Sequence, residues 1–439
     1  MRLCYSRADL FFLAGNGMFF GGYRSVLILM AYLCCFGQLV AAEETGLPEL
    51  PLSKEFRHVS AGYQHSCAVS TATTLYCWGN NAAAQLGTDD QQDHFSPTAT
   101  AATSLNWDRV SAGRFHSCAI AAKNGERRLY CWGSNGSGQL GTGDDRSGPK
   151  PLEVKGGFTD WLQVTSGISH SCAIRSEGGR NGLYCWGENK AGQAGDPSFN
   201  IVRTPRPLTG KQYGWGYVTG GFSHTCAIRD EEGKKKLYCW GANSDGQLGV
   251  GVVDRAHPGP VEVSGGFDDW TAVSGGYYHT CGIRDEGGAQ KLYCWGNGAT
   301  GQRGDGGSGR GATPVPLAGD NGSWRALAAG SNHTCAIRDE GADRALYCWG
   351  DNRYGQLGVG GEDRSNKPVK IKSVYSDWSQ LSAGETHTCA VREKSGRYQT
   401  FCWGRNQYGQ LGDGTDESRF VPTEVTNEQP KKDNRNGDR

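Results

Sequence analysis

Seven histidines each stand two residues before a cysteine, and both residue types can bind metals. A second cysteine follows each His-x-Cys, 10 to 13 residues after the first cysteine. Zinc sites instead combine short paired spacings, so we expect no metal and no cofactor here. We expect each histidine to hydrogen-bond the backbone of the Gly-x-x-His turn that contains it. The histidines are His65, His116, His170, His224, His279, His333 and His387.

The two cysteines that belong to each His-x-Cys motif form a pair, and the seven pairs recur about every 54 residues. This pattern predicts structural disulfides. Free buried thiols are the alternative. A disulfide that closes a loop of this size stabilises a fold by roughly 3 kcal/mol. The pairs are Cys67 and Cys77, Cys118 and Cys131, Cys172 and Cys185, Cys226 and Cys239, Cys281 and Cys294, Cys335 and Cys348, and Cys389 and Cys402.

The three remaining cysteines, Cys4, Cys34 and Cys35, lie in residues 1–42, a segment that we expect to be a signal peptide. Its apolar run, 25–42, follows Arg24 and ends in small residues before two glutamates. Translation from Met18 would shorten the segment, and a retained membrane anchor is the alternative to cleavage. Removal leaves an even 14 cysteines, which favours a secreted protein, extracellular or periplasmic.

The residues around each cysteine pair predict a β-hairpin. In the fourth copy, Cys226 and Ile228 share one face with Leu237 and Cys239, while a charged Gly-containing turn joins the two segments. A strand opened by Trp, or by Phe56 in the first copy, precedes each Gly-x-x-His turn, and a short Pro-containing strand follows each hairpin. Four strands per repeat describe one propeller blade.

The fold class is therefore all-β, a seven-bladed β-propeller over residues 43–426, with a disordered polar tail at 427–439. Eight segments qualify as the Pro-containing strand, one more than the seven hairpins require. We expect 421–425 to pair in the blade that contains 56–79 and so close the ring, with 48–52 as its competitor. The other six are 97–100, 149–154, 205–209, 258–263, 314–318 and 368–372.

The phrases Ser-Ala-Gly-x-x-His-Ser/Thr-Cys-Ala and Cys-Trp-Gly-x-Asn-x-x-Gly-Gln-Leu-Gly resemble the regulator of chromosome condensation repeat, in a secreted, cysteine-paired variant. The resemblance covers most of the chain and implies a seven-bladed β-propeller. The founding member of that family is nuclear, exchanges guanine nucleotide on a small GTPase and binds chromatin. This chain departs from it by its leader, its paired cysteines and its zero net charge, so we do not carry those activities over.

Composition and motifs narrow the function further. Lys+Arg and Asp+Glu balance at 45 each, so no basic field predicts nucleic-acid or membrane binding. No nucleophile–base phrase stands outside the repeat, and we expect no catalytic residue.

Loops such as 413–417 could hold Ca²⁺ but lack a regular ligand spacing, which favours a solvated loop. Sequons occur at Asn135, Asn321 and Asn332.

Binding is predicted at the two variable residues inside each Gly-x-x-His turn, because these turns should repeat on one face of the ring. We therefore expect a monomeric module that binds an unidentified protein; an extracellular enzyme or a carbohydrate-binding protein is the alternative. Arg114, Ser331 and Glu385 also vary at these turns, and Ala194, Arg303, 196–204 and 303–311 depart from the repeat elsewhere. The residues predicted to bind are Tyr63, Phe115, Ile168, Phe222, Tyr277 and Tyr278.

Overall fold

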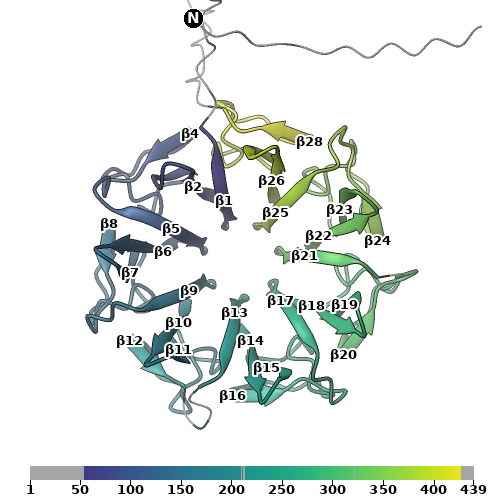
Figure 1. Cartoon of the computed structure of the whole chain (residues 1–439), viewed down its shortest axis with the longest axis horizontal. Coiled ribbons are helices and arrows are strands. Elements are labelled where there is room, and N and C mark those ends of the chain that lie inside the picture. Colours follow the sequence, from purple (N-terminus) through teal and green to yellow (C-terminus); the bar gives the residue numbers. More distant parts are fainter. Residues whose placement is uncertain (1–53, 209, 211–212, 321, 427–439) are drawn as a thin grey trace, which may run out of the picture. The chain divides into compact units, whose positions relative to one another are not determined.

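The computed structural model describes residues 54–208, 210, 213–320 and 322–426, which form a ring of seven four-stranded antiparallel sheets (Figure 1). Each sheet is one blade, numbered here from blade 1 (β1–β4) to blade 7 (β25–β28). Within the described ranges there is no helix long and apolar enough to cross a membrane. The seven-bladed propeller is confirmed. The signal segment 1–42, the segment 48–52, Asn321 and the tail 427–439 lie outside the described residues.

The strands follow one another from the axis outward in every blade. The innermost strands are β1 Phe56–Ala61, β5 Asn106–Ala112, β9 Trp161–Ser166, β13 Trp215–Gly220, β17 Trp270–Gly275, β21 Trp324–Ala329 and β25 Trp378–Ala383. The second strands are β2 His65–Ser70, β6 His116–Lys123, β10 His170–Glu177, β14 His224–Glu231, β18 His279–Glu286, β22 His333–Glu340 and β26 His387–Lys394.

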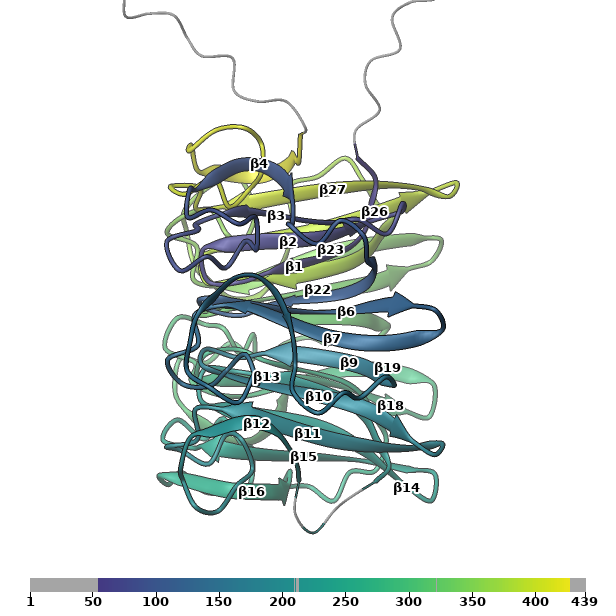
Figure 2. The same cartoon turned by 90° about the vertical axis from the view of Figure 1, so that its left-hand side faces the viewer.

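The third strands complete the cysteine hairpins and the fourth form the rim. The third strands are β3 Leu75–Gly79, β7 Glu126–Gly133, β11 Arg180–Gly187, β15 Lys234–Ala242, β19 Ala289–Gly296, β23 Asp343–Gly350 and β27 Arg397–Gly404. The fourth are β4 His94–Ala99, β8 Gly148–Glu153, β12 Val202–Pro207, β16 Ala256–Glu262, β20 Gly311–Pro316, β24 Ser365–Lys370 and β28 Arg419–Glu424. Seen edge-on, the strands run from one face of the ring to the other (Figure 2).

The predicted ring closure is wrong. β28 pairs with β27 of its own blade, and β4 fills the outer position of blade 1, so every blade is one contiguous segment. Side chains and turns join blade 7 to blade 1 instead. Gln380 accepts from Val59 N at 3.1 Å and donates to Val59 O at 3.1 Å, and Ser382 Oγ accepts from Ala61 N at 2.9 Å. These contacts satisfy the open edge of β1 without a shared strand.

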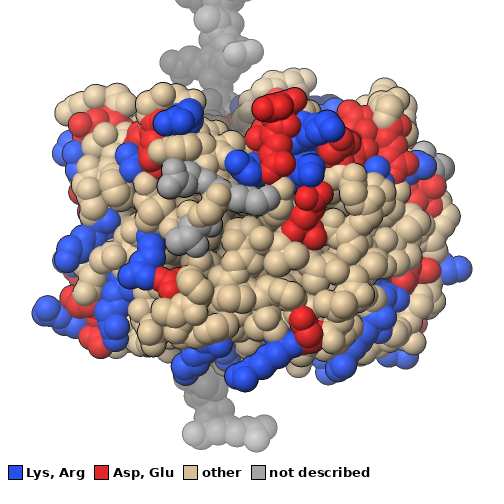
Figure 3. Space-filling model, turned by 90° about the horizontal axis from the view of Figure 1, so that it is seen from below, with Lys and Arg blue, Asp and Glu red and all other residues tan. Residues whose placement is uncertain are grey.

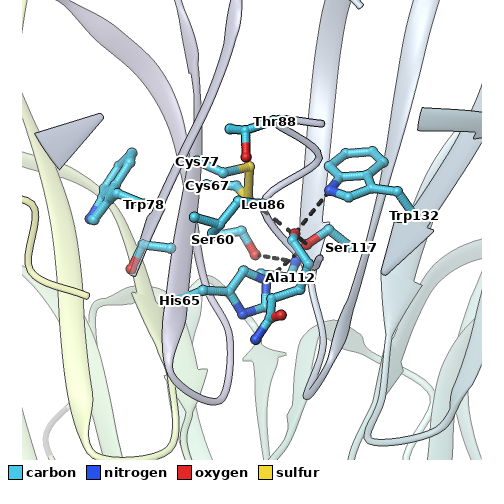
Figure 4. The surroundings of a disulfide bond; sticks show 12 residues. Ser60, His65, Cys67, Cys77, Trp78, Leu86, Thr88, Ala112, Ser117 and Trp132 are labelled. Carbon is cyan, nitrogen blue, oxygen red and sulfur yellow. Dashed lines mark hydrogen bonds between the residues drawn. A yellow bond between two sulfur atoms is a disulfide. The ribbon is translucent and has the colours of Figure 1, made fainter. Parts of the chain in front are cut away.

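The seven repeated histidines hydrogen-bond a hydroxyl of the next blade instead of the backbone of their own turns, which corrects the expected partner. His65 Nε2 lies 2.8 Å from Ser117 Oγ of blade 2, while that hydroxyl donates to Gln85 O at 2.9 Å (Figure 4). Because the single hydroxyl proton is used on Gln85, the histidine must be the donor. Trp132 Nε1 donates to the same carbonyl at 2.9 Å.

The same contact recurs in all seven gaps between blades, including His387 with Ser66 at the closure. Burial lowers the pKa of His65 to about 3 and that of His170 to about 4, so these rings stay neutral. A glutamine of the repeat also satisfies a buried turn, since Gln85 Oε1 accepts from Ala83 N at 2.9 Å. The histidines and glutamines are therefore structural.

All seven predicted cysteine pairs are disulfides in the structure. In each, the two cysteines are directly opposed in the antiparallel register, as Cys226 is to Cys239, and all fourteen are fully buried. The opening tryptophan packs beside them, with the rings of Trp107 and Trp132 in edge contact at 6.2 Å. Alternation of side chains thus placed the sulfur atoms face to face.

Two blades depart from the repeat at the position that holds a buried leucine in the other five. In blade 3 this residue is Ala194, and the side chain of Leu208 occupies space beside it at Gly195. In blade 5 it is Arg303, which is only 7% exposed and forms an ion pair with Asp305 at 2.6 Å. A Cβ at Gly311 would lie 2.2 Å from its guanidinium, which explains the glycine at this position in the loop 303–311.

Candidate binding site at the mouth of the central channel

The seven Gly-x-x-His turns meet at one end of the central channel, where they enclose a partly open cavity of about 80 Å³. Every blade contributes the last residue of its innermost strand and the glycine that follows. A Cβ at Gly62 would lie 2.5 Å from Gly113 O of the next blade, so the close approach of the turns requires glycine. The expectation that these turns share one face is confirmed by this common cavity.

The seven turns form a collar around the axis, because each turn glycine closely approaches the turn of the next blade, and backbone hydrogen bonds link four of the seven neighbouring pairs. Tyr63 N donates to Gly113 O at 3.0 Å, and Glu385 N donates to Gly62 O at 3.1 Å across the closure between blades 7 and 1. Phe222 and Ser331 make the same contact with the next blade. The side chains on the collar are therefore held by a fixed backbone.

Five of the six predicted binding residues form one aromatic cluster on this collar: Tyr63, Phe115, Phe222, Tyr277 and Tyr278. Ring centroids of Phe115 and Tyr63 are 5.7 Å apart, and those of Tyr63 and Tyr277 are 6.3 Å apart. Phe222 contacts Tyr277 at 5.2 Å and Tyr278 at 5.3 Å. Tyr278 is 37% exposed. Ile168, the sixth residue, is buried in the cavity wall and lies outside the cluster.

Two charged side chains complete the site, and the sequence showed them only as variable turn residues. Arg114 places its guanidinium 4.7 Å from the ring centroids of both Tyr63 and Phe115. Glu385 lines the cavity from blade 7, and burial raises the pKa of its carboxyl, opposed by hydrogen bonding to Tyr63 and Gln64. Burial also raises the pKa of Tyr63 and of Tyr277. Charged and aromatic side chains thus line the same small cavity.

Deeper in the channel, the innermost strands carry His58, Arg109 and Tyr217. Burial raises the pKa of Tyr217 in blade 4, and the positive charge of Arg109 in blade 2 opposes that rise. The same charge adds to the effect of burial in lowering the pKa of His58 in blade 1. The Tyr217 side chain is 39% exposed. Burial lowers the pKa of His58 to about 4. Asp108 is engaged by Arg57 at 3.5 Å and by Arg127. These residues do not supply the paired carboxylates that glycoside hydrolysis uses.

Metal ligation has no support among residues 54–208, 210, 213–320 and 322–426, where no group of three His, Cys, Asp or Glu side chains could hold an ion. In the loop 413–417, Asp413 accepts from Asn406 Nδ2 at 3.0 Å and from Arg419 Nε at 2.7 Å. Its carboxylate is used by protein donors.

The sequon at Asn135 is fully buried, whereas Asn332 is half-buried on a Gly-x-x-His turn.

These features define a disulfide-stapled β-propeller with an aromatic cluster at the mouth of its central channel. The chain belongs to the family of the regulator of chromosome condensation (RCC1) repeat. One model of that repeat matches residues 74–120, 128–174, 235–283, 291–337, 344–391 and 399–433, and a second matches six segments between 56 and 356. The family expected from the repeat phrases is therefore confirmed.

Known proteins agree with this assignment. The ultraviolet-B receptor UVR8 of Arabidopsis thaliana is 32% identical over 390 residues, 87% of this chain and 83% of that protein. The human E3 ubiquitin-protein ligase HERC2 is 28% identical over 375 residues, 82% of this chain but 7% of that protein.

Solved structures show the same fold at low sequence identity. Yeast RCC1 (Prp20), solved bound to Kap60, has a TM-score of 0.66 and 21% identity over 81% of this chain and 84% of that one. Human WBSCR16 has a TM-score of 0.67 and 21% identity over 80% of this chain and 93% of that one.

Proposed function

We propose that this chain is an exported, monomeric protein-binding module that holds its partner on the aromatic cluster at the channel mouth, without catalysis. Export rests on the signal-like segment 1–42 and on the fourteen cysteines, all paired, that follow it. Protein binding is supported by the family, since the yeast relative was solved bound to Kap60 and its binding to Gsp1p and histones was studied.

The observation that carries the proposal is the aromatic cluster itself. Binding hot spots are enriched in tyrosine and arginine, gather near the centre of an interface and need a rigid support. Tyr278, Phe222 and Arg114 meet this description, because they lie on the closely packed collar of turns. Acidic and basic side chains elsewhere are intermingled, as the view in Figure 3 shows, which gives no single-sign field for nucleic acid.

The direct test places a photo-crosslinking amino acid at Tyr278 and, as a matched control, at Phe199, which is 43% exposed on the blade 3 insertion. Purified chain beginning at residue 43 is mixed with extracellular fluid of the source organism and irradiated. A discrete crosslinked protein at Tyr278 but not at Phe199, lost when Phe222→Ala is added, is the expected result. Equal crosslinking at both positions, or none at Tyr278, contradicts the proposal.

A further inference from the structure

Three polar atoms that face the channel-mouth cavity are buried without a hydrogen-bond partner among the described residues: Glu385 Oε2, Tyr277 Oη and Arg114 Nε. Buried polar groups in native proteins are nearly always paired, so each exception needs an explanation. Here the three belong to blades 7, 5 and 2 and converge on one cavity. The fold does not require this arrangement, since the other turns place Ile168 and Ser331 at the same structural position.

The three atoms differ in what they offer a ligand. Arg114 Nε–H can only donate, an ionised Glu385 can only accept, and the Tyr277 hydroxyl can do either. Within the described part of the chain, the arginine and the glutamate form no ion pair with each other within 4.0 Å, although both line the cavity. Their charges cancel. A ligand that satisfies all three must therefore be neutral overall and must present an acceptor on one side and a donor on the other.

The size and the walls of the cavity restrict the ligand further. A space of about 80 Å³ holds several water molecules, at roughly 10 to 15 Å³ each, and hence a group of a few heavy atoms. The rings of Tyr63 and Tyr277 border this space, so a group bound there lies next to both rings. A ligand with a net charge would leave the charge of either Arg114 or Glu385 uncompensated in this confined site.

We propose that the channel mouth binds a primary carboxamide, presented as an asparagine or glutamine side chain of the protein partner. Its carbonyl oxygen accepts from Arg114 Nε and the Tyr277 hydroxyl, and its amide nitrogen donates to Glu385 Oε2. That the partner is a protein rests on the proposed function. The carboxamide site itself can be tested without any partner.

The test compares three probes of nearly equal shape and different charge: propionamide, propylammonium and propionate. Binding is followed by chemical-shift changes of isotope-labelled tyrosine rings in the disulfide-bonded chain. Propionamide should shift Tyr63 and Tyr277 saturably, with at least about five-fold tighter binding than either charged probe. Tighter binding of propylammonium or propionate, or no shift of these two rings, overturns the proposal.

The variant Tyr277→Phe removes one hydroxyl and keeps the ring, so it should weaken propionamide about five-fold or more. Tyr375→Phe, which changes a ring packed against Phe401 on another part of blade 7, is the matched control and should leave the affinity unchanged. An equal loss in both variants points to an indirect structural effect and contradicts the assignment.

A second experiment reaches the protein partner. Displayed random peptides are selected on the wild-type chain and counter-selected on Tyr277→Phe. Enrichment of Asn or Gln at one position supports the proposal, whereas enrichment of Lys, Asp or Glu overturns it. Crosslinking from Tyr278 tests the proposed function independently, so a failure of either idea can be recognised without the other.

Discussion

The rings of Tyr63 and Tyr277 lie parallel, at 6° with centroids 6.3 Å apart, although they belong to blades 1 and 5. These blades are not neighbours in a ring of seven. The contact therefore spans the mouth of the channel rather than a gap between adjacent blades. It brings together two blades that are otherwise connected only through the blades that lie between them in the ring.

The first prediction tests this cross-axis contact with the variants Tyr63→Ala and Tyr277→Ala and the double variant. Aromatic pairs are worth about 0.5–1.5 kcal/mol beyond the area they bury, so the two single losses in free energy of unfolding should not add. Denaturant unfolding with the disulfides intact measures the coupling.

The pair Tyr63→Ala with Tyr398→Ala is the control, because Tyr398 packs elsewhere, against the cluster of blades 7 and 1. Its losses should add within about 0.5 kcal/mol. Full additivity for Tyr63 and Tyr277 would show that the two rings are not coupled in solution.

The second prediction concerns the disulfides. Alkylation without reduction of the chain produced in an oxidising compartment should label none of the fourteen cysteines between residues 67 and 402, as read by mass spectrometry. Replacing Cys226 and Cys239 together by alanine should lower the free energy of unfolding by about 2–4 kcal/mol, since a loop constraint on the unfolded chain is lost. Labelling of half or more of these cysteines would show buried thiols instead.

Much of this architecture could be predicted because it is local and periodic. Alternation along each hairpin placed Cys226 opposite Cys239, and the period of the repeat placed the variable turns on one face. The ring closure was wrong because eight Pro-containing segments look alike, and which strand 419–424 pairs with is decided by the free edge of β27. The hydroxyl partner of each histidine was missed because it lies in the next blade, over 50 residues away.

The candidate site, too, could be predicted from the sequence only in part. The aromatic residues were found because they interrupt the repeat at a fixed position. Arg114 and Glu385 stand at the same variable positions, but nothing in the sequence shows that they share a cavity with Tyr277. That neighbourhood depends on the diameter of the ring and on side chains from three blades. Variable polar residues beside variable aromatic ones on a closed ring are the signal that could have indicated it.

The third prediction is a dependence of stability on pH. The seven histidines between blades have folded pKa values of about 3 to 4, below the ordinary value near 6.5. Below pH 6.5 the unfolded chain therefore binds protons that the folded chain does not, and stability falls as the pH falls from about 6.5 toward 3.

The variant His224→Gln isolates one of these groups, because an amide can still donate to Thr280 Oγ1 but does not titrate. The slope of the free energy of unfolding against pH, measured between pH 4.5 and 6, should decrease by about 1.4 kcal/mol per pH unit. An unchanged slope would mean that the imidazole is already protonated in the folded chain.

The fourth prediction concerns Arg303, which stands where five blades hold a buried leucine and pairs with Asp305 in a nearly dry site. Arg303→Leu alone leaves the carboxylate of Asp305 buried without its partner, and it should lower the free energy of unfolding by about 3–5 kcal/mol. Blade 6 carries Leu357 and Val359 at the two equivalent positions. The double variant Arg303→Leu with Asp305→Val reproduces that pair.

Because a well-packed apolar pair can replace a buried ion pair without loss, the double variant should be as stable as the natural chain or up to about 4 kcal/mol more stable. Denaturant midpoints of the two single variants and the double variant measure the difference. Asp305→Val alone leaves the guanidinium of Arg303 buried and unpaired, so it serves as the second, matched single variant. Since Gly311 makes room for that guanidinium, a double variant as unstable as the singles would show that loop 303–311 cannot close over leucine.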